Sequence, residues 1–436
     1  MQILIFISAI TYDAMYKCNL CDDEDLLMVW DGARCGLIGK AKKGAVGSTL
    51  MKILPKENIH KEYLYHFISS KFTTLNTKPK GVGIPHIEPT LLWNFELVVP
   101  PLPEQKAIVA KIEELLSDLE NGKKQLQTAQ QQLKIYRKAL IMEAVTGKIT
   151  AKWRAKHPNA DNSEIIYQKI QNHLDKTFKA LSEDAASKGK RKPKDQRNNK
   201  KTTNVMADLP ELPPNWNYYR LEDITYLVTD GTHFTPKYQD SGVKFLSVKN
   251  VRPFYFRDEE VKYISEEEHN RLIERCNPQK NDILYTKVGA TYGYAAKVTL
   301  DYEFSIFVSL CLIKPVTKFF SSSFLEILMN SELVFKQARK RVSGSGVPDL
   351  HLIEIRDFKI PLPPIEEQLK IVEELESKLT VCDKIEETIA QSLQQAETLR
   401  QSILKKAFEG KLCPNPDLHD EHDLKMKPSA KQKVVA

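Results

Sequence analysis

The stretch "VVPPLPEQKAIVAKIEELL" at residues 98–116 recurs in the same chain as "PLPPIEEQLKIVEELESKL" at residues 361–379. The two stretches are identical at 8 of 19 positions without a gap, and 263 residues separate them. At the same offset "GVGIPHI" (81–87) aligns with "GSGVPDL" (344–350). Similarity at one fixed offset indicates an internal duplication, which constrains the architecture of a chain more than any single motif does.

A second pair of similar segments lies upstream of this anchor. "DLLMVWDGARCG" (25–36) resembles "DILYTKVGATYG" (282–293) at an offset of 257 residues, so the two copies differ by six residues in length between the anchors. Residues 216–356 alternate short apolar, strand-like runs with Gly, Asn, Asp and Pro turns. We therefore predict an α+β (mixed α/β) fold with two units in tandem repeat, each followed by a long helix. Trp216 would align about 41 residues before Met1, so we expect the first unit to be N-terminally incomplete.

The long helix of each copy carries a coiled-coil pattern. Prolines precede each helix and Gly147 or Gly410 ends it, which are the usual places of these residues at helix ends. Apolar residues recur every seven positions, as in a coiled-coil seam. The predicted seam comprises Ile112, Leu119, Leu126, Leu133 and Leu140 in the first helix and Leu375, Ile385, Ile389, Leu399 and Ile403 in the second. A helix with one apolar stripe needs a partner, and the pattern alone allows parallel or antiparallel pairing.

These patterns divide the chain into six segments. We predict a first unit at 1–99, a first spacer helix at 100–147, a linker with a short helix and a basic run at 148–208, a second unit at 209–360, a second spacer helix at 361–410 and a polar tail at 411–436. Shorter helices are expected at 163–187 and at 321–341.

The net charge of +7 is concentrated in one segment. Residues 188–201 hold eight Lys or Arg and one Asp, so the remainder of the chain sums to about zero. We interpret this run as a solvated linker, with a flexible arm that holds phosphates as the alternative. Bulk charge therefore does not show that the folded units bind DNA.

Composition indicates a cytoplasmic protein. No apolar run is long enough to span a bilayer, and the opening "MQILIFISAI" is expected to be a buried strand and not a signal peptide. Seven scattered cysteines suit a reducing compartment. Cys18 and Cys21 form a lone C-x-x-C without a second pair, so a zinc site is not favoured.

Motifs of catalysis are missing from the sequence. "ARCGLIGKA" (33–41) approaches a phosphate-binding loop but has Arg34 in place of the first glycine and Ala41 in place of Ser or Thr. No methylase-type glycine-rich loop or N-P-P-Y pocket is present. We read "DGTH" (230–233) as a turn with an exposed polar tip. The sequence therefore predicts a chain that is not an enzyme and that needs no cofactor or metal.

Recognition is the remaining class of function. Asn and Arg can pair bidentately with base edges, while Lys holds phosphates. The candidate DNA contacts are His233, Lys237, Tyr238, Lys249, Asn250, Arg252, Lys287 and Tyr292 in the second unit and Arg34, Lys40, Lys42 and Lys43 in the first.

The duplicated motifs resemble those of specificity subunits of type I restriction–modification enzymes. The resemblance rests on "PPLPEQ" and "PPIEEQ", on "LPPNW" and "DGTH", and on "FLSVKNV", "DILYTKVGATYG" and "GSGVPDL", which occur in order over nearly the whole chain. It implies that each unit is a target recognition domain that reads half of a bipartite DNA sequence, and that the two helices form an antiparallel spacer. It further implies two modification (methyltransferase) subunits and restriction subunits as partners, which would supply S-adenosylmethionine, ATP and Mg²⁺ chemistry.

Two other classes of function remain open. A coiled-coil scaffold or protein-binding adaptor would show no salt-dependent, sequence-selective binding to double-stranded DNA. An enzyme in its own right would methylate or cut DNA without partners.

Overall fold

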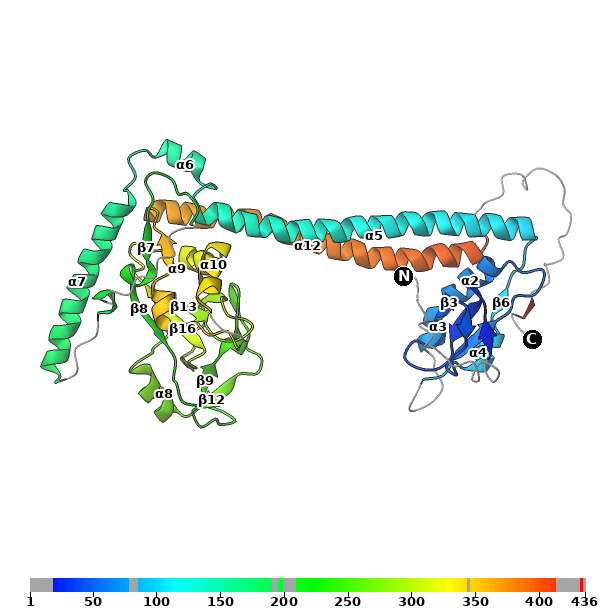
Figure 1. Ribbon diagram of the computed structural model, residues 1–436, viewed down its shortest axis with the longest axis horizontal. Coiled ribbons are helices and arrows are strands. Elements are labelled where there is room, and N and C mark those ends of the chain that lie inside the picture. The colour runs from blue at the N-terminus through cyan, green and yellow to red at the C-terminus, as the bar shows by residue number, and fades with distance from the viewer. Residues whose placement is uncertain are drawn as a thin grey trace. The chain divides into compact units, whose positions relative to one another are not determined.

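The computed structural model describes residues 19–77, 85–189, 195–198, 209–342, 346–412 and 432–433 (Figure 1). The chain divides into two compact units, and the boundary between them crosses both long helices. The first unit comprises residues 1–130 and 387–436, and the second comprises 131–386. Each unit therefore contains part of α5 (Leu102–Val145) and part of α12 (Ile365–Phe408), which are both 44 residues long.

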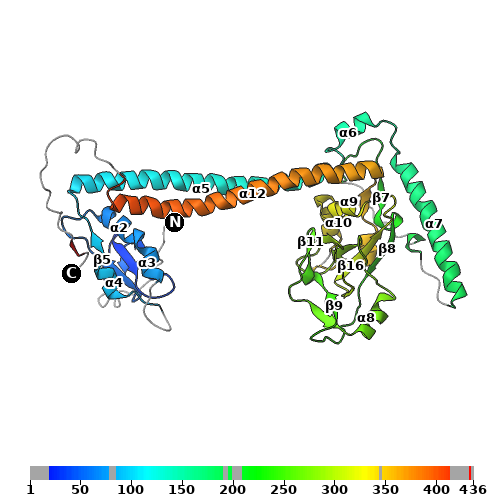
Figure 2. The ribbon, with the colours of Figure 1, turned by 180° about the vertical axis from the view of Figure 1, so that it is seen from behind.

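Helices α5 and α12 pair antiparallel. In the first unit Lys123 Nζ lies 3.7 Å from a carboxylate oxygen of Glu397, and in the second unit Arg137 Nη2 lies 2.5 Å from Asp383 Oδ1. A higher residue number in α5 thus faces a lower number in α12, and the two ribbons lie side by side in both views (Figures 1 and 2). The prediction of an antiparallel pair is confirmed.

Two residues of the expected seam lie outside it. Ile385 is 45% exposed and Leu399 is 51% exposed, so their assignment to the seam is wrong. The buried residues of this part of α12 are Cys382, Ile389 and Ala396. The residues three positions before them, Leu379, Glu386 and Leu393, are half-buried. Because a helix turns every 3.6 residues, positions three and four apart flank the same stripe, and only the partner's location decides which flank is covered.

The other expected seam residues are covered to different degrees. Leu119 and Leu126 are half-buried. The buried members are Ile112, Leu133, Leu140, Leu375, Ile389 and Ile403.

The second unit is built on two small sheets. A four-stranded antiparallel sheet has the order β14 (Ala295–Lys297), β13 (Ile283–Thr286), β16 (Leu310–Pro315), β8 (Thr225–Asp230). A three-stranded sheet has the order β12 (Lys262–Ile264), β9 (Val243–Leu246), β15 (Phe304–Ile306), with β15 parallel to β9. Two short antiparallel pairs complete the strands, β10 (Val251–Arg252) with β11 (Tyr255–Phe256) and β7 (Tyr218–Arg220) with β17 (Lys359–Pro361).

Helices surround these sheets. The predicted helix at 163–187 is confirmed as α7 (Ser163–Ser187). The single helix expected at 321–341 is two helices, because Ser331 caps a second one through its hydroxyl, which accepts from Val334 N. The helices are α6 (Ala151–Lys156), α7, α8 (Glu266–Ile273), α9 (Ser322–Met329), α10 (Glu332–Arg341) and α11 (Leu352–Arg356), with 3-10 turns at Gln196–Asn198, Leu221–Asp223 and Val248–Asn250.

The first unit is a smaller version of the second. Its main antiparallel sheet has the order β3 (Ile38–Lys40), β2 (Leu26–Val29), β5 (Leu50–Ile53). Strand β1 (Leu20–Cys21) pairs with β4 (Gly44–Ala45), and β6 (Glu96–Leu97) pairs with β18 (Gln432–Lys433). The helices are α2 (Lys61–Ser70), α3 (Phe72–Thr77) and α4 (Pro89–Trp93), which pack on the sheet around Met28, Phe67 and Leu75.

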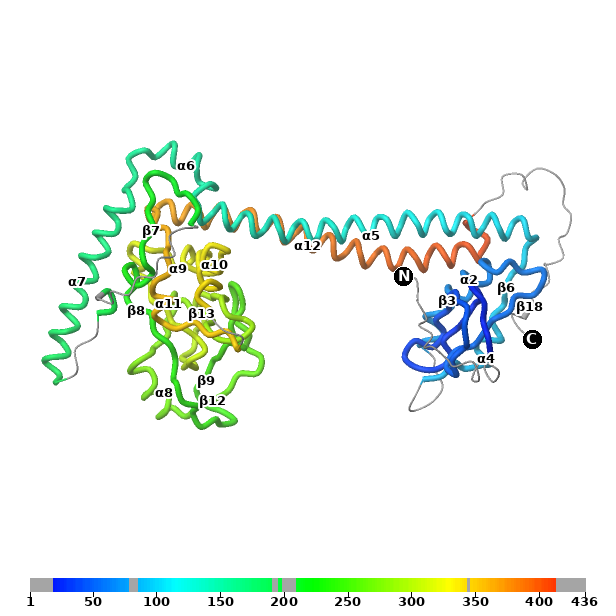
Figure 3. Tube along the Cα trace, in the orientation of Figure 1, coloured from blue at the N-terminus to red at the C-terminus, as the bar shows by residue number. Residues whose placement is uncertain are grey.

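The duplicated turns have the same backbone hydrogen bonds in both units. Gly32 N donates to Pro85 O at 2.7 Å, and Gly289 N donates to Pro348 O at 2.8 Å. The next glycine of each turn has a positive φ, +87° at Gly36 and +94° at Gly293, in the region that favours glycine. The corresponding traces can be followed in Figure 3. The tandem repeat is therefore confirmed in structure as well as in sequence.

Several expectations lie outside the described residues. They concern the opening strand, Cys18 of the C-x-x-C pair, most of the basic run at 188–201 and most of the tail after residue 412. Among the helices that the structure describes, none has a stretch long and apolar enough to cross a membrane.

Candidate functional site

A buried carboxylate organises the end of β8 in the second unit. Asp230 is 2% exposed, and its Oδ1 accepts hydrogen bonds from Arg275 Nη2 at 2.5 Å and from His233 Nε2 at 3.2 Å. Arg275 Nη1 also donates to Gly231 O at 3.0 Å. The DGTH motif therefore has a buried acid that fixes the start of an exposed loop. The expectation of a polar turn holds for His233 but not for Asp230.

The loop after Asp230 presents polar and aromatic groups to solvent. His233, Phe234, Lys237 and Tyr238 are all exposed. Lys262 Nζ lies 3.9 Å from the ring centroid of Tyr238, which orders that ring on the surface. The loop thus offers hydrogen-bond donors and flat aromatic faces on a fixed support.

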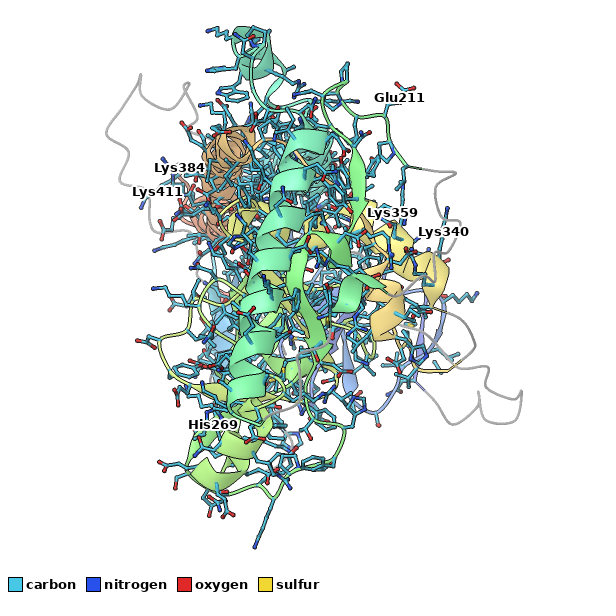
Figure 4. The ribbon with its side chains drawn as sticks, turned by 90° about the vertical axis from the view of Figure 1, so that its left-hand side faces the viewer. Glu211, His269, Lys340, Lys359, Lys384 and Lys411 are labelled. Atoms are coloured by element: carbon cyan, nitrogen blue, oxygen red, sulfur yellow. The ribbon has the colours of Figure 1, made fainter. Side chains whose placement is uncertain are left out.

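Helix α8 and the residues directly after it supply two arginines beside this loop, Arg271 within the helix and Arg275 two residues beyond its end. The guanidinium of Arg271 lies 4.9 Å from the ring centroid of Phe234, and Arg275 is anchored on Asp230. His269, labelled in Figure 4, is buried with its Nδ1 2.9 Å from Ser305 Oγ and so fixes the opposite face of α8. Loop and helix border a cavity of about 320 Å³. The sequence analysis missed both arginines.

Asn250 and Arg252 are corrections to the predicted DNA contacts. Asn250 is 2% exposed, its Oδ1 accepts from Ser247 N at 3.0 Å, and its Nδ2 donates to Arg257 O and Glu259 O, both at 3.2 Å. The amide is consumed by the turn and cannot read a base edge. Arg252 folds back onto the same turn, with Nη1 2.7 Å from Val251 O.

Lys287 and Tyr292 also have structural environments. Lys287 is 5% exposed, and its Nζ lies 3.8 Å from Asp230 Oδ2 and 3.5 Å from Asp349 Oδ1. This lysine neutralises buried acid and does not face a phosphate, so its assignment is wrong. Tyr292 is half-buried and stacks on Phe335 with ring centroids 5.5 Å apart.

Lys249 is the basic residue of its loop that remains outside. Its side chain is 70% exposed, and its Nζ lies 3.0 Å from Glu260 Oε2, which is 73% exposed. An exposed ion pair of this kind contributes little and exchanges readily for another anion. Lys249 therefore stays available to a phosphate.

The candidates of the first unit divide in the same way. Lys40 lies between two carboxylates, 2.9 Å from Glu62 and 3.4 Å from Glu24, and these acids raise its pKa although partial burial opposes the change. Lys42 and Lys43 are exposed on the turn between β3 and β4.

Arg34 has a different setting. It is exposed and borders a cavity of about 720 Å³ whose lining includes residues of α5 and α12. Arg34, Lys42 and Lys43 are thus the exposed cations of the first unit's expected set.

The duplicated PEQ and EEQ motifs act at helix starts. Gln105 and Gln368 are each 0% exposed. Gln105 accepts from His60 N at 2.7 Å and donates to Asn58 O at 2.9 Å and Pro100 O at 2.8 Å. Gln368 accepts from Ser321 N at 2.7 Å and donates to Phe319 O at 3.0 Å and Pro363 O at 2.8 Å. One glutamine thus ties the start of the long helix to the turn that begins α2 in the first unit and to the turn that begins α9 in the second.

No group of three His, Cys, Asp or Glu side chains in the part of the chain that the structure describes has the arrangement of a metal site. The described cysteines are buried and unpaired, and burial raises the pKa of Cys276 to about 12, so this thiol stays protonated near neutral pH.

Comparison with known proteins gives a consistent answer. The family model described as "Type I restriction modification DNA specificity domain" matches residues 7–128 and 213–395, one segment in each repeat. The EcoBI specificity subunit of Escherichia coli is 26% identical over 407 residues, which cover 91% of this chain and 76% of that protein. The MjaVIII specificity subunit of Methanocaldococcus jannaschii is 25% identical, with 90% and 80% covered.

Solved structures share the fold. A chain of a type I restriction–modification system, from work on its complex assembly and conformational transition, superposes with a TM-score of 0.57 at 19% identity and covers 90% of this chain and 83% of that one. The HsdS subunit from Thermoanaerobacter tengcongensis gives a TM-score of 0.50 at 17% identity, with 90% and 82% covered. Two matched family segments, two structural repeats and an antiparallel helix pair agree, and the chain belongs to the type I restriction–modification DNA specificity family.

Proposed function

We propose that this chain reads a bipartite DNA sequence, one half with each unit, and holds the modification and restriction subunits of a type I system. As a specificity subunit it recognises DNA and is not the catalytic component. The observation that carries the proposal is that the two matched family segments coincide with the two structural repeats, so that the recognition unit is present twice.

The second unit would contact DNA through its exposed loop and α8. His233, Lys237, Tyr238 and Lys249 are exposed, and Arg271 and Arg275 lie beside them. Lysines would hold phosphates and set the register, while loop and arginine groups would read base edges. In the first unit Lys42 and Lys43 would serve as phosphate contacts.

The helix pair would receive the partner subunits. In the first unit a shallow groove of about 670 Å³ lies on α5 and α12, and its lining includes Leu119, Leu126, Ala396 and Leu399. An exposed leucine beside small residues suits the insertion of a partner side chain. S-adenosylmethionine, ATP and Mg²⁺ would act in those partners.

Salt dependence of DNA binding tests the DNA contacts. In the complex reconstituted with the modification subunits, Lys237→Ala with Lys249→Ala should weaken binding and lower the slope of log K against log salt by about one per lost phosphate contact. Lys318→Ala, an exposed lysine outside the set, is the matched control. An unchanged slope would reject these contacts, and binding without salt or sequence dependence would favour the adaptor function.

Methylated-base mapping in cells that carry the whole system tests the bipartite reading. Two specific half-sites at a fixed spacing are expected, and a single half-site would show that only one unit reads sequence.

Leu399→Glu should reduce association with the modification subunit by tenfold or more, as expected for an apolar anchor replaced by a buried charge (about 2 kcal/mol).

A further inference from the structure

A two-residue turn in the second unit holds a bulky aromatic residue where glycine is favoured. Strands β10 and β11 form a hairpin in which Arg252 pairs with Tyr255, so Pro253 and Phe254 make its turn. The φ of Phe254 is +71°. A positive φ at the second central residue of a turn favours Gly or Asn, because a larger side chain is strained there. The hairpin therefore carries a phenylalanine at a conformational cost.

The aromatic residues of this turn contribute little to the core of the unit. Phe254 is 42% exposed and Tyr255 is 52% exposed. Phe256, the next residue along β11, instead packs against the buried cluster that contains Leu246 and Val251. Packing within the unit thus accounts for Phe256 but not for a strained phenylalanine at position 254.

The hairpin is held by hydrogen bonds at its tip and at its foot. Phe254 N donates to Ala295 O, in β14, at 2.9 Å, and Arg257 N donates to Asn250 O at 2.8 Å. The buried amide of Asn250 also donates to Arg257 O and Glu259 O. The hairpin lies at the edge of the second unit, where β11 is labelled in Figure 2. The exposed rings are therefore presented on a preorganised support, which lowers the ordering cost of binding.

Cations flank the foot of the hairpin. Lys249 lies two residues before β10 ends the turn at Val251, Arg257 directly follows β11, and both are exposed. A hairpin brings its two ends together, so one cation lies on each side of the aromatic tip's support. This arrangement suits a polyanion whose interior is apolar and stacked, as in duplex DNA.

Acidic residues limit how many phosphates this surface can hold. Asp258 accepts from Tyr302 Oη at 2.7 Å and lies 3.5 Å from Lys244 Nζ, and Glu260 pairs with Lys249. Residues 244–260 hold four Lys or Arg and three Asp or Glu, a net charge of +1. The charge favours contact through the aromatic tip over a broad grip on the DNA backbone.

We propose that the β10–β11 hairpin inserts Phe254 and Tyr255 as a wedge between neighbouring base pairs of the DNA that the second unit binds. The inference rests on the proposed DNA recognition, because Lys249, a phosphate contact proposed above, brings the duplex to the foot of the hairpin. Wedges of this kind unstack a base step and kink the duplex by about 20–90°. The energy of this deformation depends on the base step, so the wedge adds specificity where no base edge is contacted.

Phe254→Gly separates a role in DNA binding from a role in folding. In the complex with the modification subunits, affinity for a duplex that carries the mapped target should fall at least tenfold, because stacking on bases is lost. The denaturation midpoint of the chain should not fall, because glycine relieves the strained φ. Phe254→Tyr should bind DNA as the wild-type chain does, because it keeps the ring. Leu181→Ala, which truncates a side chain that is 48% exposed on α7, is the matched control.

Two further measurements distinguish a wedge from a phosphate contact. The slope of log K against log salt should be the same for Phe254→Gly and the wild-type chain, since the ring displaces no counterion. Förster transfer between dyes at the two ends of the duplex should show a bend in the wild-type complex that is smaller in the variant complex.

An equal bend in the two complexes overturns the inference, while specific binding by the wild-type complex leaves the proposed DNA recognition intact. A wild-type complex that binds no specific duplex overturns both. A Phe254→Gly chain that folds but no longer assembles with the modification subunits overturns the wedge in favour of a protein-docking hairpin.

Discussion

Glu367 and Glu104 occupy the same place in a duplicated motif and have opposite environments. Glu367 is 0% exposed and is held by three donors, while Glu104 lies in solvent at the first turn of its helix. The adjacent glutamines, Gln368 and Gln105, have nearly the same three hydrogen bonds in both units. The glutamine of the motif thus has the same role within both units, whereas the environment of the glutamate depends on the segment that covers it.

Removal of Glu367 should have the largest effect of the changes considered. Glu367→Ala leaves Trp216 Nε1 and Arg154 without their acceptor in a buried place, and we expect a loss of about 4 kcal/mol in the free energy of unfolding of the second unit. Glu104→Ala should cost no more than about 0.5 kcal/mol in the first unit. Hydrogen exchange by mass spectrometry in each unit measures both, and equal losses would contradict the comparison.

The glutamines should be equivalent where the glutamates differ. Gln105→Ala and Gln368→Ala each remove three buried hydrogen bonds, and we expect each to destabilise its own unit by about 3 kcal/mol. Hydrogen exchange of the helices that begin near His60 and Ser321 reports the two effects separately. A large effect in only one unit would show that the duplicated motif is structural in that unit alone.

Acid should destabilise the first unit more than the second, because of His66. Burial lowers the pKa of this histidine to about 4, below its ordinary value of 6.5, and its ring lies 5% exposed in the first unit. The unfolded chain therefore binds a proton more readily between these pH values, so stability is complete above pH 6.5 and falls as pH approaches 4. At pH 5 the loss is about 2 kcal/mol.

Hydrogen exchange of peptides from α2, compared at pH 7 and pH 5, measures this loss of stability. His66→Leu should remove most of the pH dependence from α2. The second unit, which does not contain His66, is the internal reference. An α2 that is equally protected at both pH values in the wild-type chain would reject the assignment.

The smallest effects are expected on the exposed flank of the helix pair. Ile385→Lys and Leu399→Lys should each change the free energy of unfolding by about 0.5 kcal/mol or less, since both side chains already lie in solvent. Leu375→Lys, at a buried seam position of the same helix, should instead cost several kcal/mol. Denaturant unfolding of the three variants ranks them, and similar losses would place the flank inside the seam.

Sequence predicted the features that depend on local pattern. The duplication, the two long helices, the helix at 163–187 and the family all follow from periodicity, helix-end residues and motif order. The structure confirms the helices because a helix can be recognised from its own residues and one apolar stripe.

Tertiary structure decided which polar residues face outward. Asn250 and Lys287 have the right chemistry for DNA, yet the first is consumed by the Ser247 turn and the second by Asp230 and Asp349. Residue type does not distinguish the buried Lys287 from Lys249, which is exposed. Sequence position does not do so either, because Lys249 is the direct neighbour of the buried Asn250. Only the fold brings a distant acid or carbonyl to such a side chain.

The duplicated stretch itself shows the same division. By itself the sequence determined that "PPLPEQ" and "PPIEEQ" start equivalent helices and that their glutamines and glutamates correspond. The fold decided that Glu367 is sealed beneath Trp216 while Glu104 is open, because burial depends on the segments that pack over a motif and not on the motif.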